Sequence, residues 1–199
     1  MTWELLSVGD DRLAPRRDLA VARTQVLATP VPDATQRDTR DRMLAFVDAH
    51  PDALDRTCVE GHLTGSALLV DHEGSKVMML FHRKAQRWLQ PGGHADGDAN
   101  LAAVARREAE EETGIGGLAV MVPPIDLDIH RVAFPGEEPH LHLDVRFLVI
   151  APEGAEPSGN HESEALRWVS MADLDSLEVD PGTRRMARRG LALAGPRCL

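Results

Sequence analysis

The spacing of hydrophobic positions changes along the chain and predicts helices at its ends and strands in its middle. Segment 34–50, ATQRDTRDRMLAFVDAH, carries an apolar stripe at helical spacing, with Asp33 as N-cap and Pro51 just after its end. A second helix is predicted over 18–28, and the polar turn ATPVPD separates the two. Residues 1 to about 56 are therefore expected to be helical and polar.

From about residue 62 the pattern becomes that of β-strands. Runs rich in aliphatic and β-branched residues, bounded by turn residues, indicate strands. The predicted strands cover 62–71, 76–83, 88–94, 118–134, 140–152 and 165–170. The connection HEGS indicates a hairpin between the first two. Gly92 and Gly93 are expected to form a turn at the end of the third.

Helices are also predicted over 99–113, just after Ser170, and over 180–195. Gly114 is a C-terminal signal for the first, and Ser170 with Asp173 resembles a capping box. Strands that flank and follow one long helix, with helices at both ends of the chain, predict an α/β sandwich around a mixed sheet.

Chain length and composition predict one hydrophobic core. The chain has 199 residues, of which 43% are hydrophobic. We expect residues 1–56 to form a helical N-terminal arm packed on the core, and 57–199 to form the main domain. An arm of this size with few apolar anchors is marginal as an independent unit.

Charge and targeting signals narrow the classes of function. The formal net charge of −10 argues against non-specific nucleic-acid binding and against anionic membrane surfaces, both of which need basic patches. No segment approaches the ~20 apolar residues of a membrane span, and the N-terminus does not resemble a signal peptide. Two distant cysteines, Cys58 and Cys198, fit a reducing compartment. A cytoplasmic protein is expected.

The most informative segment is the acidic helix predicted over 99–113. Three glutamates, Glu108, Glu111 and Glu112, fall on the side that continues its apolar stripe, whereas Glu110 falls on the opposite, solvated side. Like charges at this spacing repel, and a buried unpaired carboxylate is costly. Such acids therefore face a cleft or a cation, and carboxylate oxygens suit Mg²⁺ or Mn²⁺. The competing interpretation is a solvated acidic face on a surface helix.

This segment resembles the signature of the Nudix hydrolase family, G-x5-E-x7-R-E-U-x-E-E-x-G-U, where U is a bulky aliphatic residue. Gly93 matches the first glycine. The later positions are matched by Arg107, Glu108, Glu111, Glu112, Gly114 and Ile115. The clear departure is Ala99, where the pattern has glutamate; the nearby Asp96 or Asp98 could partly replace it. Flanking features extend the resemblance over about 62–177.

The resemblance implies a Nudix-like α/β/α sandwich and hydrolysis of a nucleoside diphosphate linked to another moiety, or of a related diphosphate. It implies that Glu108, Glu111 and Glu112 bind Mg²⁺ or Mn²⁺, and that Arg107 orients them through a charge-assisted pair. Some members draw a further acid, a metal ligand or general base, from a loop near the end of the sheet. Glu162 is the first candidate here, and Glu164 is the second.

Other polar residues are candidates for contact with a small-molecule nucleotide or diphosphate substrate. The candidate substrate-binding residues are Arg83, Lys84, Gly92, Gly93 and His94. His140 and His142 share one strand face and, with Asp144, predict a polar cleft wall. Both a ligand role and a structural, hydrogen-bonded role stay open for these histidines. The arginine pairs at 184–185 and 188–189 are expected to bind surface acids.

Two other functions are consistent with the sequence. Ala99 favours a catalytically weakened nucleotide-binding or regulatory module on the Nudix fold. An isomerase on the same fold, acting on an isoprenoid diphosphate, is disfavoured because no cysteine lies near the glycine pair. Substrate choice is expected to depend on the N-terminal arm and the 134–140 loop, and the arm is also a candidate surface for homodimer formation.

Overall fold

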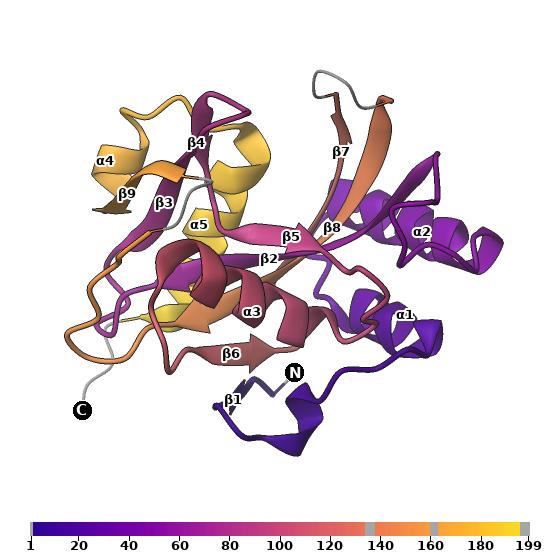
Figure 1. The fold of residues 1–199 in the computed structure, drawn as a ribbon, viewed down its shortest axis with the longest axis horizontal. Helices are drawn as coiled ribbons and strands as arrows, with labels where there is room; N and C mark the ends of the chain where they lie inside the picture. Colours follow the sequence, from indigo (N-terminus) through magenta and orange to yellow (C-terminus); the bar gives the residue numbers. More distant parts are fainter. Residues whose placement is uncertain (1, 134–137, 160–162, 196–199) are drawn as a thin grey trace.

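The computed structural model describes residues 2–133, 138–159 and 163–195, and these residues contribute nine strands to one sheet (Figure 1). Two long strands lie at its centre, β2 (Gly61–Val70) and β8 (His140–Ile150). The other strands are β1 (Glu4–Leu6), β3 (Val77–His82), β4 (Arg87–Leu89), β5 (Gly92–His94), β6 (Ala119–Val122), β7 (Asp126–Val132) and β9 (Ser163–Val169).

The sheet is mixed, as predicted. β2 and β8 pair in parallel, with His62 opposite His142 and Val70 opposite Ile150. The strand order is β1-β6-β8-β2-β3-β4, with β5 paired to β2, β7 to β8 and β9 to β3. All of these other pairings are antiparallel. The parallel pair brings together two segments that are far apart in sequence.

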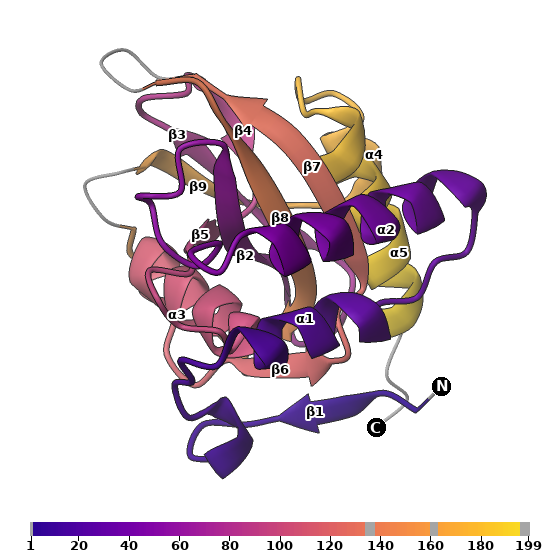
Figure 2. The same cartoon turned by 90° about the vertical axis from the view of Figure 1, so that its right-hand side faces the viewer.

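Helices cover both faces of this sheet, which makes the fold an α/β/α sandwich. Helix α3 (Leu101–Thr113) lies in front of the sheet and α5 (Pro181–Ala194) behind it (Figure 1). Helices α1 (Leu19–Ala28) and α2 (Ala34–Ala49) lie side by side across one end (Figure 2). A 3-10 turn, η1 (Asp11–Leu13), and the short α4 (Met171–Leu174) complete the described elements.

Two hydrophobic cores lie on the two faces of β2 and β8. Leu63, Ala67 and Leu69 pack with the α1–α3 side, whereas Leu68 and Val70 pack with α5. This alternation is the period-2 pattern of a strand buried on both faces. On the face of Leu68 and Val70, the first half of β2 carries polar residues instead, and that half forms the site described below.

The predicted helices are confirmed, and so are the predicted capping residues Asp33, Gly114 and Ser170 with Asp173. The side chains of Asp18, Asp33 and Asp180 each accept a backbone N–H at the start of α1, α2 and α5. Ser170 and Asp173 form the capping box at the start of α4. Gly114 ends α3 in the left-handed conformation, with φ 69°, which glycine adopts without steric cost.

Two local predictions were wrong. Gly92 and Gly93 do not form a turn but belong to strand β5, opposite Ser66 and Gly65 of β2. The turn comes a few residues later, where positive φ values occur. The N-terminal segment is not purely helical, because β1 pairs with β6 and extends the sheet. Three residues are too few for alternation to be visible in sequence.

Hydrogen bonds from the side-chain amides of two glutamines hold the N-terminal helices against the rest of the chain. The side chain of Gln36, 1% exposed, donates to the Leu127 carbonyl and accepts from the Leu127 N–H. Gln25 bonds to Asn100 and to the N–H of Leu101. The arm therefore packs on the sheet and on α3. Its division from the main domain at residue 56 stays a prediction.

Two further points concern membrane-spanning helices and the cysteines. Among the described residues, the helices are too short or too polar to cross a bilayer. Cys58 is a buried free thiol, while Cys198 lies outside the described residues.

Candidate functional site

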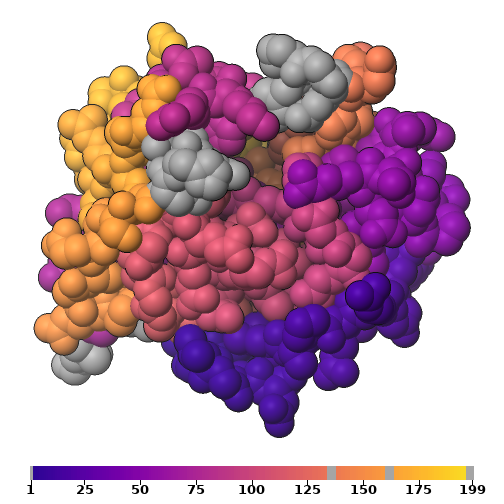
Figure 3. Space-filling model, viewed as in Figure 1, coloured from indigo at the N-terminus to yellow at the C-terminus, as the bar shows by residue number. Residues whose placement is uncertain are grey.

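A large cavity opens where the polar half of β2 and β8 meets the C-terminal half of α3. Its volume is about 1470 Å³. In the space-filling view it is a hollow above α3, beside the β3–β4 hairpin (Figure 3). The lining residues discussed below come from α3, from the strands β2, β5 and β8, from the β3–β4 turn and from the loop after β5.

Helix α3 approaches the sheet closely because glycines face it. A Cβ at Gly65 of β2 would lie 2.8 Å from the Leu101 carbonyl oxygen, and a Cβ at Gly93 of β5 would lie 2.1 Å from Oε2 of Glu108. Both distances are shorter than side-chain atoms allow. The glycines therefore let the helix bring its glutamates against the strand that borders the cavity.

The three predicted glutamates all line the cavity, with different environments. Glu112 is 5% exposed, and its Oε2 accepts the N–H of Gly92 at 2.9 Å. The Glu108 side chain is 20% exposed and that of Glu111 is 62% exposed. Burial raises the pKa of Glu108, Arg107 opposes this shift, and Glu111 adds to it. The cluster thus concentrates negative charge that its protein partners offset only in part.

Arg107 is the cation within this cluster. Its guanidinium lies 3.3 Å from Glu108 Oε1, 4.0 Å from Glu111 Oε1 and 3.7 Å from Asp98 Oδ2. A guanidinium shared among several carboxylates fixes their orientation more than it neutralises their charge. This arrangement fits the orienting role expected for Arg107.

Glu110 differs from its predicted environment. Its side chain is only 27% exposed and pairs with Arg106 at 2.6 Å, so the expectation of a solvated Glu110 was wrong. The angular position of Glu110 on the helix directs it away from the cavity. This position alone does not show whether neighbouring side chains cover Glu110. Glu110 is absent from the cavity lining, in contrast to the other three glutamates.

Ala99, the departure from the family pattern, is fully buried in the α1–α3 core. The adjacent Asp98 accepts the N–H groups of Arg16 and Asn100 through Oδ1, and its Oδ2 is directed toward Arg107. Asp96 lines the cavity and forms a two-bond pair with Arg56. Of the two proposed replacements, Asp98 is the one that contacts Arg107.

The predicted substrate-binding residues all line the same cavity. Arg83 and Lys84 are exposed in the turn between β3 and β4. Gly92, Gly93 and His94 form β5, at the foot of the acidic cluster. Glu162 lies outside the described residues. Glu164, a weaker candidate, is exposed and accepts a bond from Gln86 at 3.3 Å.

Histidines cover the cavity wall opposite the turn. The rings of four histidines approach one another, with centroids 4.7–5.1 Å apart in five of their pairs: His62, His94, His140 and His142. Burial lowers the pKa of His94 to about 4, and Arg56 and neighbouring imidazoles add to this shift. Burial and neighbouring imidazoles lower the pKa of His142 to about 2. The rings of His94 and His142 are therefore neutral near pH 7.

A buried ion network lies below the histidines. Arg146 is 1% exposed, and its guanidinium contacts Asp144 at 2.7 Å, Asp128 at 3.2 Å and Asp126 at 3.5 Å. Arg185 of α5 pairs with two of these acids, Asp126 and Asp128. Two of the four clustered arginines of α5, Arg185 and Arg189, thus pair with the buried Asp126. For these two, the prediction that they bind surface acids was wrong.

Sequence reasoning missed His62, Arg146 and the acids of β7. His140, His142 and Asp144 were placed correctly on one strand face, because alternation along a single strand is visible in sequence. The match of His62 with His142 depends on the parallel register of two distant strands. Alternating polar residues in HLTGS were the available signal, since His62, Thr64 and Ser66 share one face.

Comparison with known proteins agrees with this architecture. A model of the NUDIX domain matches residues 62–190. Phosphatase NudJ of Escherichia coli K12 is 36% identical over 90 residues, which cover 44% of this chain and 54% of NudJ. The match thus spans about half the length of such curated relatives.

Solved structures give the same result. A NUDIX-family hydrolase from Clostridium perfringens superposes with a TM-score of 0.57 at 26% identity, over 67% of this chain and 98% of that one. The E. coli dihydroneopterin triphosphate pyrophosphohydrolase gives 0.53 at 16% identity, over 66% and 95% of the two chains, a likeness of fold alone. Because the family model covers well over half of its length, the chain belongs to the Nudix family.

Proposed function

We propose that this chain is a cation-dependent hydrolase that cleaves a phosphoric anhydride in a nucleoside diphosphate linked to another group, or in a related diphosphate. The observation that carries the proposal is the convergence of Glu108, Glu111 and Glu112 on one cavity, with Arg107 between them. Family membership and the likeness to a relative named a phosphatase support the same reaction class.

The donor set suits Mg²⁺ or Mn²⁺. Carboxylate oxygens are the hard ligands that these ions prefer. The raised pKa of Glu108 reflects burial and the nearby Glu111 charge, and a bound cation would relieve both. Glycine at position 93 leaves open the space beside Glu108 that a Cβ would fill. When bound, the ion supplies charge neutralisation for phosphate oxygens and activation of water.

The surrounding residues have separate tasks in this proposal. Arg107 holds Glu108 in position, and the Gly92 N–H fixes Glu112. Arg83 and Lys84, at the cavity mouth, offer positive charge to a diphosphate. A carboxylate must accept a proton from the attacking water, and Glu162 stays the candidate for this role.

The test is product release from a panel of nucleoside triphosphates, nucleotide sugars and dinucleoside polyphosphates, with Mg²⁺ or Mn²⁺. Glu111→Gln and Glu112→Gln should each lower kcat/KM by roughly 10- to 100-fold or more, since they remove a charged oxygen from the donor set. Glu110→Gln is the matched control on the same helix and should leave activity near that of the wild type.

Two results would contradict the proposal. One is a wild-type protein inactive on the whole panel, and the other is full activity in both glutamine variants. Nucleotide binding by calorimetry without turnover would favour the weakened binding module that Ala99 suggested.

A further inference from the structure

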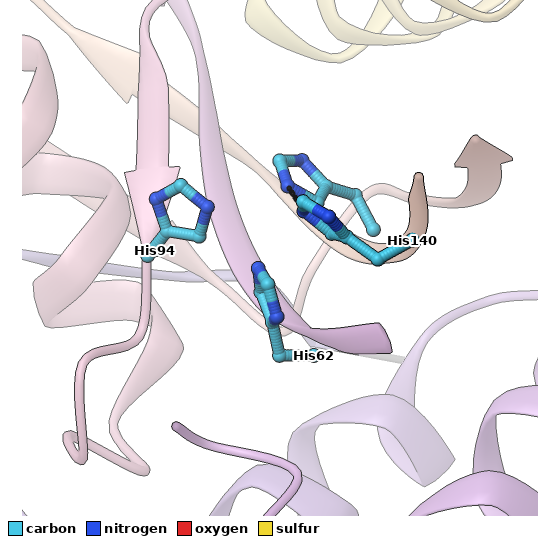
Figure 4. A group of neighbouring side chains, drawn as sticks. His62, His94 and His140 are labelled. Atoms are coloured by element: carbon cyan, nitrogen blue, oxygen red, sulfur yellow. Dashed lines mark hydrogen bonds between the residues drawn. The ribbon is translucent and has the colours of Figure 1, made fainter. Parts of the chain in front are cut away.

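Four histidines from three strands converge on the cavity wall, at a place that the proposed carboxylate chemistry does not use. His62 lies on β2, His94 on β5, and His140 and His142 on β8. Figure 4 shows the rings of His62, His94 and His140 directed into one shared space. One ring nitrogen from each of the four lies within 4.8 Å of those of the others. We propose that these four imidazoles bind a divalent transition-metal ion of the Zn²⁺ class.

His62 is the strongest reason for this proposal. The residue is 3% exposed, and neither ring nitrogen has a hydrogen-bond partner among the residues that the structure describes. Burial lowers the pKa of His62, and the nearby Cys58 backbone opposes this shift only in part. A buried polar group without a partner is unfavourable, and such groups are rare. A metal ion bound by one of these nitrogens would account for the buried ring.

His140 is held in the orientation of a metal ligand. Its Nδ1 lies 2.8 Å from the Glu138 carbonyl oxygen and must donate the proton there, because a carbonyl only accepts. The lone pair is then on Nε2, which lies 3.2 Å from Nε2 of His142. A second ring nitrogen bonded to a backbone carbonyl is the usual support of a metal-binding histidine.

The spacing of the four rings is close to that of a tetrahedral site. Zn–N bonds of about 2.0–2.1 Å place ligand nitrogens roughly 3.3–3.4 Å apart. The His140–His142 pair already has this separation. The wider pairs, up to 4.8 Å, need ring rotations and small shifts. His130 contacts His142 but bonds to Asp128 at 3.1 Å, so it lies outside the set.

The chemistry of the set separates it from the glutamate cluster. It contains four imidazole nitrogen donors and no carboxylate, so it suits Zn²⁺, Co²⁺, Ni²⁺ or Cu²⁺ and not Mg²⁺. A cation there would place positive charge on a wall of the cavity that the glutamates also line. It would also link β2, β5 and β8 at the cavity.

The test is a Co²⁺ titration of the untagged, metal-stripped protein, followed by absorption spectroscopy and then by competition with Zn²⁺. The wild type should bind one equivalent with the intense visible bands of tetrahedral Co²⁺, and Zn²⁺, but not excess Mg²⁺, should remove them. His62→Ala and the half-exposed His140→Ala should each weaken binding by at least about 10-fold. His72→Ala, in the β2–β3 turn, is the matched control and should bind as the wild type does.

Absence of these bands in the wild type, or binding that is unchanged in both His62→Ala and His140→Ala, would overturn the proposal. Circular dichroism of each variant shows whether it folds, and His140→Ala keeps the test decisive if the buried His62→Ala does not. The proposal is independent of the hydrolase assignment. Glu112→Gln should lose hydrolysis and keep the Co²⁺ bands, so that each proposal can fail without the other.

Discussion

Gly93 is the residue on which the geometry of the acidic cluster depends most directly. A Cβ there would lie 2.1 Å from Glu108 Oε2 and 2.4 Å from its carboxyl carbon. Gly93→Ala should therefore displace Glu108 and lower kcat/KM on the order of 100-fold, as expected for misplacement of a reacting group by about 1 Å. Steady-state kinetics, with the melting temperature as a check on folding, measure this.

The matched control for Gly93→Ala is Gly116→Ala. A Cβ at Gly116 would meet no atom within 4 Å, and its φ is not positive. This variant should keep wild-type kinetics. Equal kcat/KM values for the two alanine variants would mean that Glu108 does not need its present position.

Ala99 shows why a missing motif residue cannot simply be restored. Its side chain is fully buried in the α1–α3 core. Ala99→Glu should lower the free energy of unfolding by at least about 1–3 kcal/mol, because it overpacks the site and buries a carboxylate beside Asp98. It should not raise activity. Urea denaturation measures the loss, and Ala34→Glu on the exposed start of α2 is the control.

A more active Ala99→Glu variant of unchanged stability would contradict this expectation. It would mean that the glutamate leaves the core and reaches the cavity, as the family pattern implies. The buried position of the alanine instead indicates that Asp98, through its contact with Arg107, is the acid present at this end of the cluster.

At the scale of elements, helix α3 begins without a capping side chain of its own. Asn100 makes no cap bond, and Gln25 of α1 accepts the Leu101 N–H at 2.9 Å in its place. Gln25→Ala should lower the free energy of unfolding by about 1 kcal/mol. It should also lower kcat/KM, since α3 carries the glutamates. Thr24→Ala, one residue away and exposed, should change neither quantity.

Denaturation curves and kinetics on the two variants test this coupling between the arm and the site. A Gln25→Ala protein that matches Thr24→Ala in both would mean that α1 merely covers α3. The hydrogen bond between Gln25 and the Leu101 N–H already shows that the arm contacts the start of α3 directly.

Elements whose signals are local were predictable from the sequence. Asp33 and Gly114 mark helix ends through their own backbone chemistry, and the glutamates of α3 follow from helical periodicity. The position of β5 and the pairing of His62 with His142 depend on which strands become neighbours. That choice is made by packing over the whole sheet. The acidic cluster and the shared face of His140 and His142 were therefore predictable, whereas the convergence of His62 and His94 with them was not.

At the scale of the whole molecule, the buried ion network joins the sheet to α5. Asp128 of β7 bonds to Arg146 of β8, to Arg185 of α5 and to His130. Asp180 at the start of α5 is a further charge close to this group. Fixed charges that link two layers should make the stability of the fold depend on pH.

The sign of that dependence follows from the pKa of Asp128. Burial alone raises this pKa, but the bond to His130 and the charges of Arg146 and Arg185 outweigh burial, so the pKa lies well below its ordinary value of 3.8. A carboxyl group whose pKa is lower in the folded state stabilises the fold fully above its unfolded pKa. This contribution is lost progressively as the pH falls below about 3.8.

Asp128→Asn should therefore cost about 1–3 kcal/mol of unfolding free energy at pH 7, because the ion pairs with the guanidinium groups of Arg146 and Arg185 lose their negative partner. The difference from the wild type should shrink when the denaturation is repeated below pH 3.8, where the wild-type carboxylate begins to lose its advantage. Asp175→Asn removes an acid paired with Arg184 at the surface and should have little effect at either pH. A difference between Asp128→Asn and wild type that stays constant from pH 7 to pH 3 would mean that Asp128 acts through its shape and not through its charge.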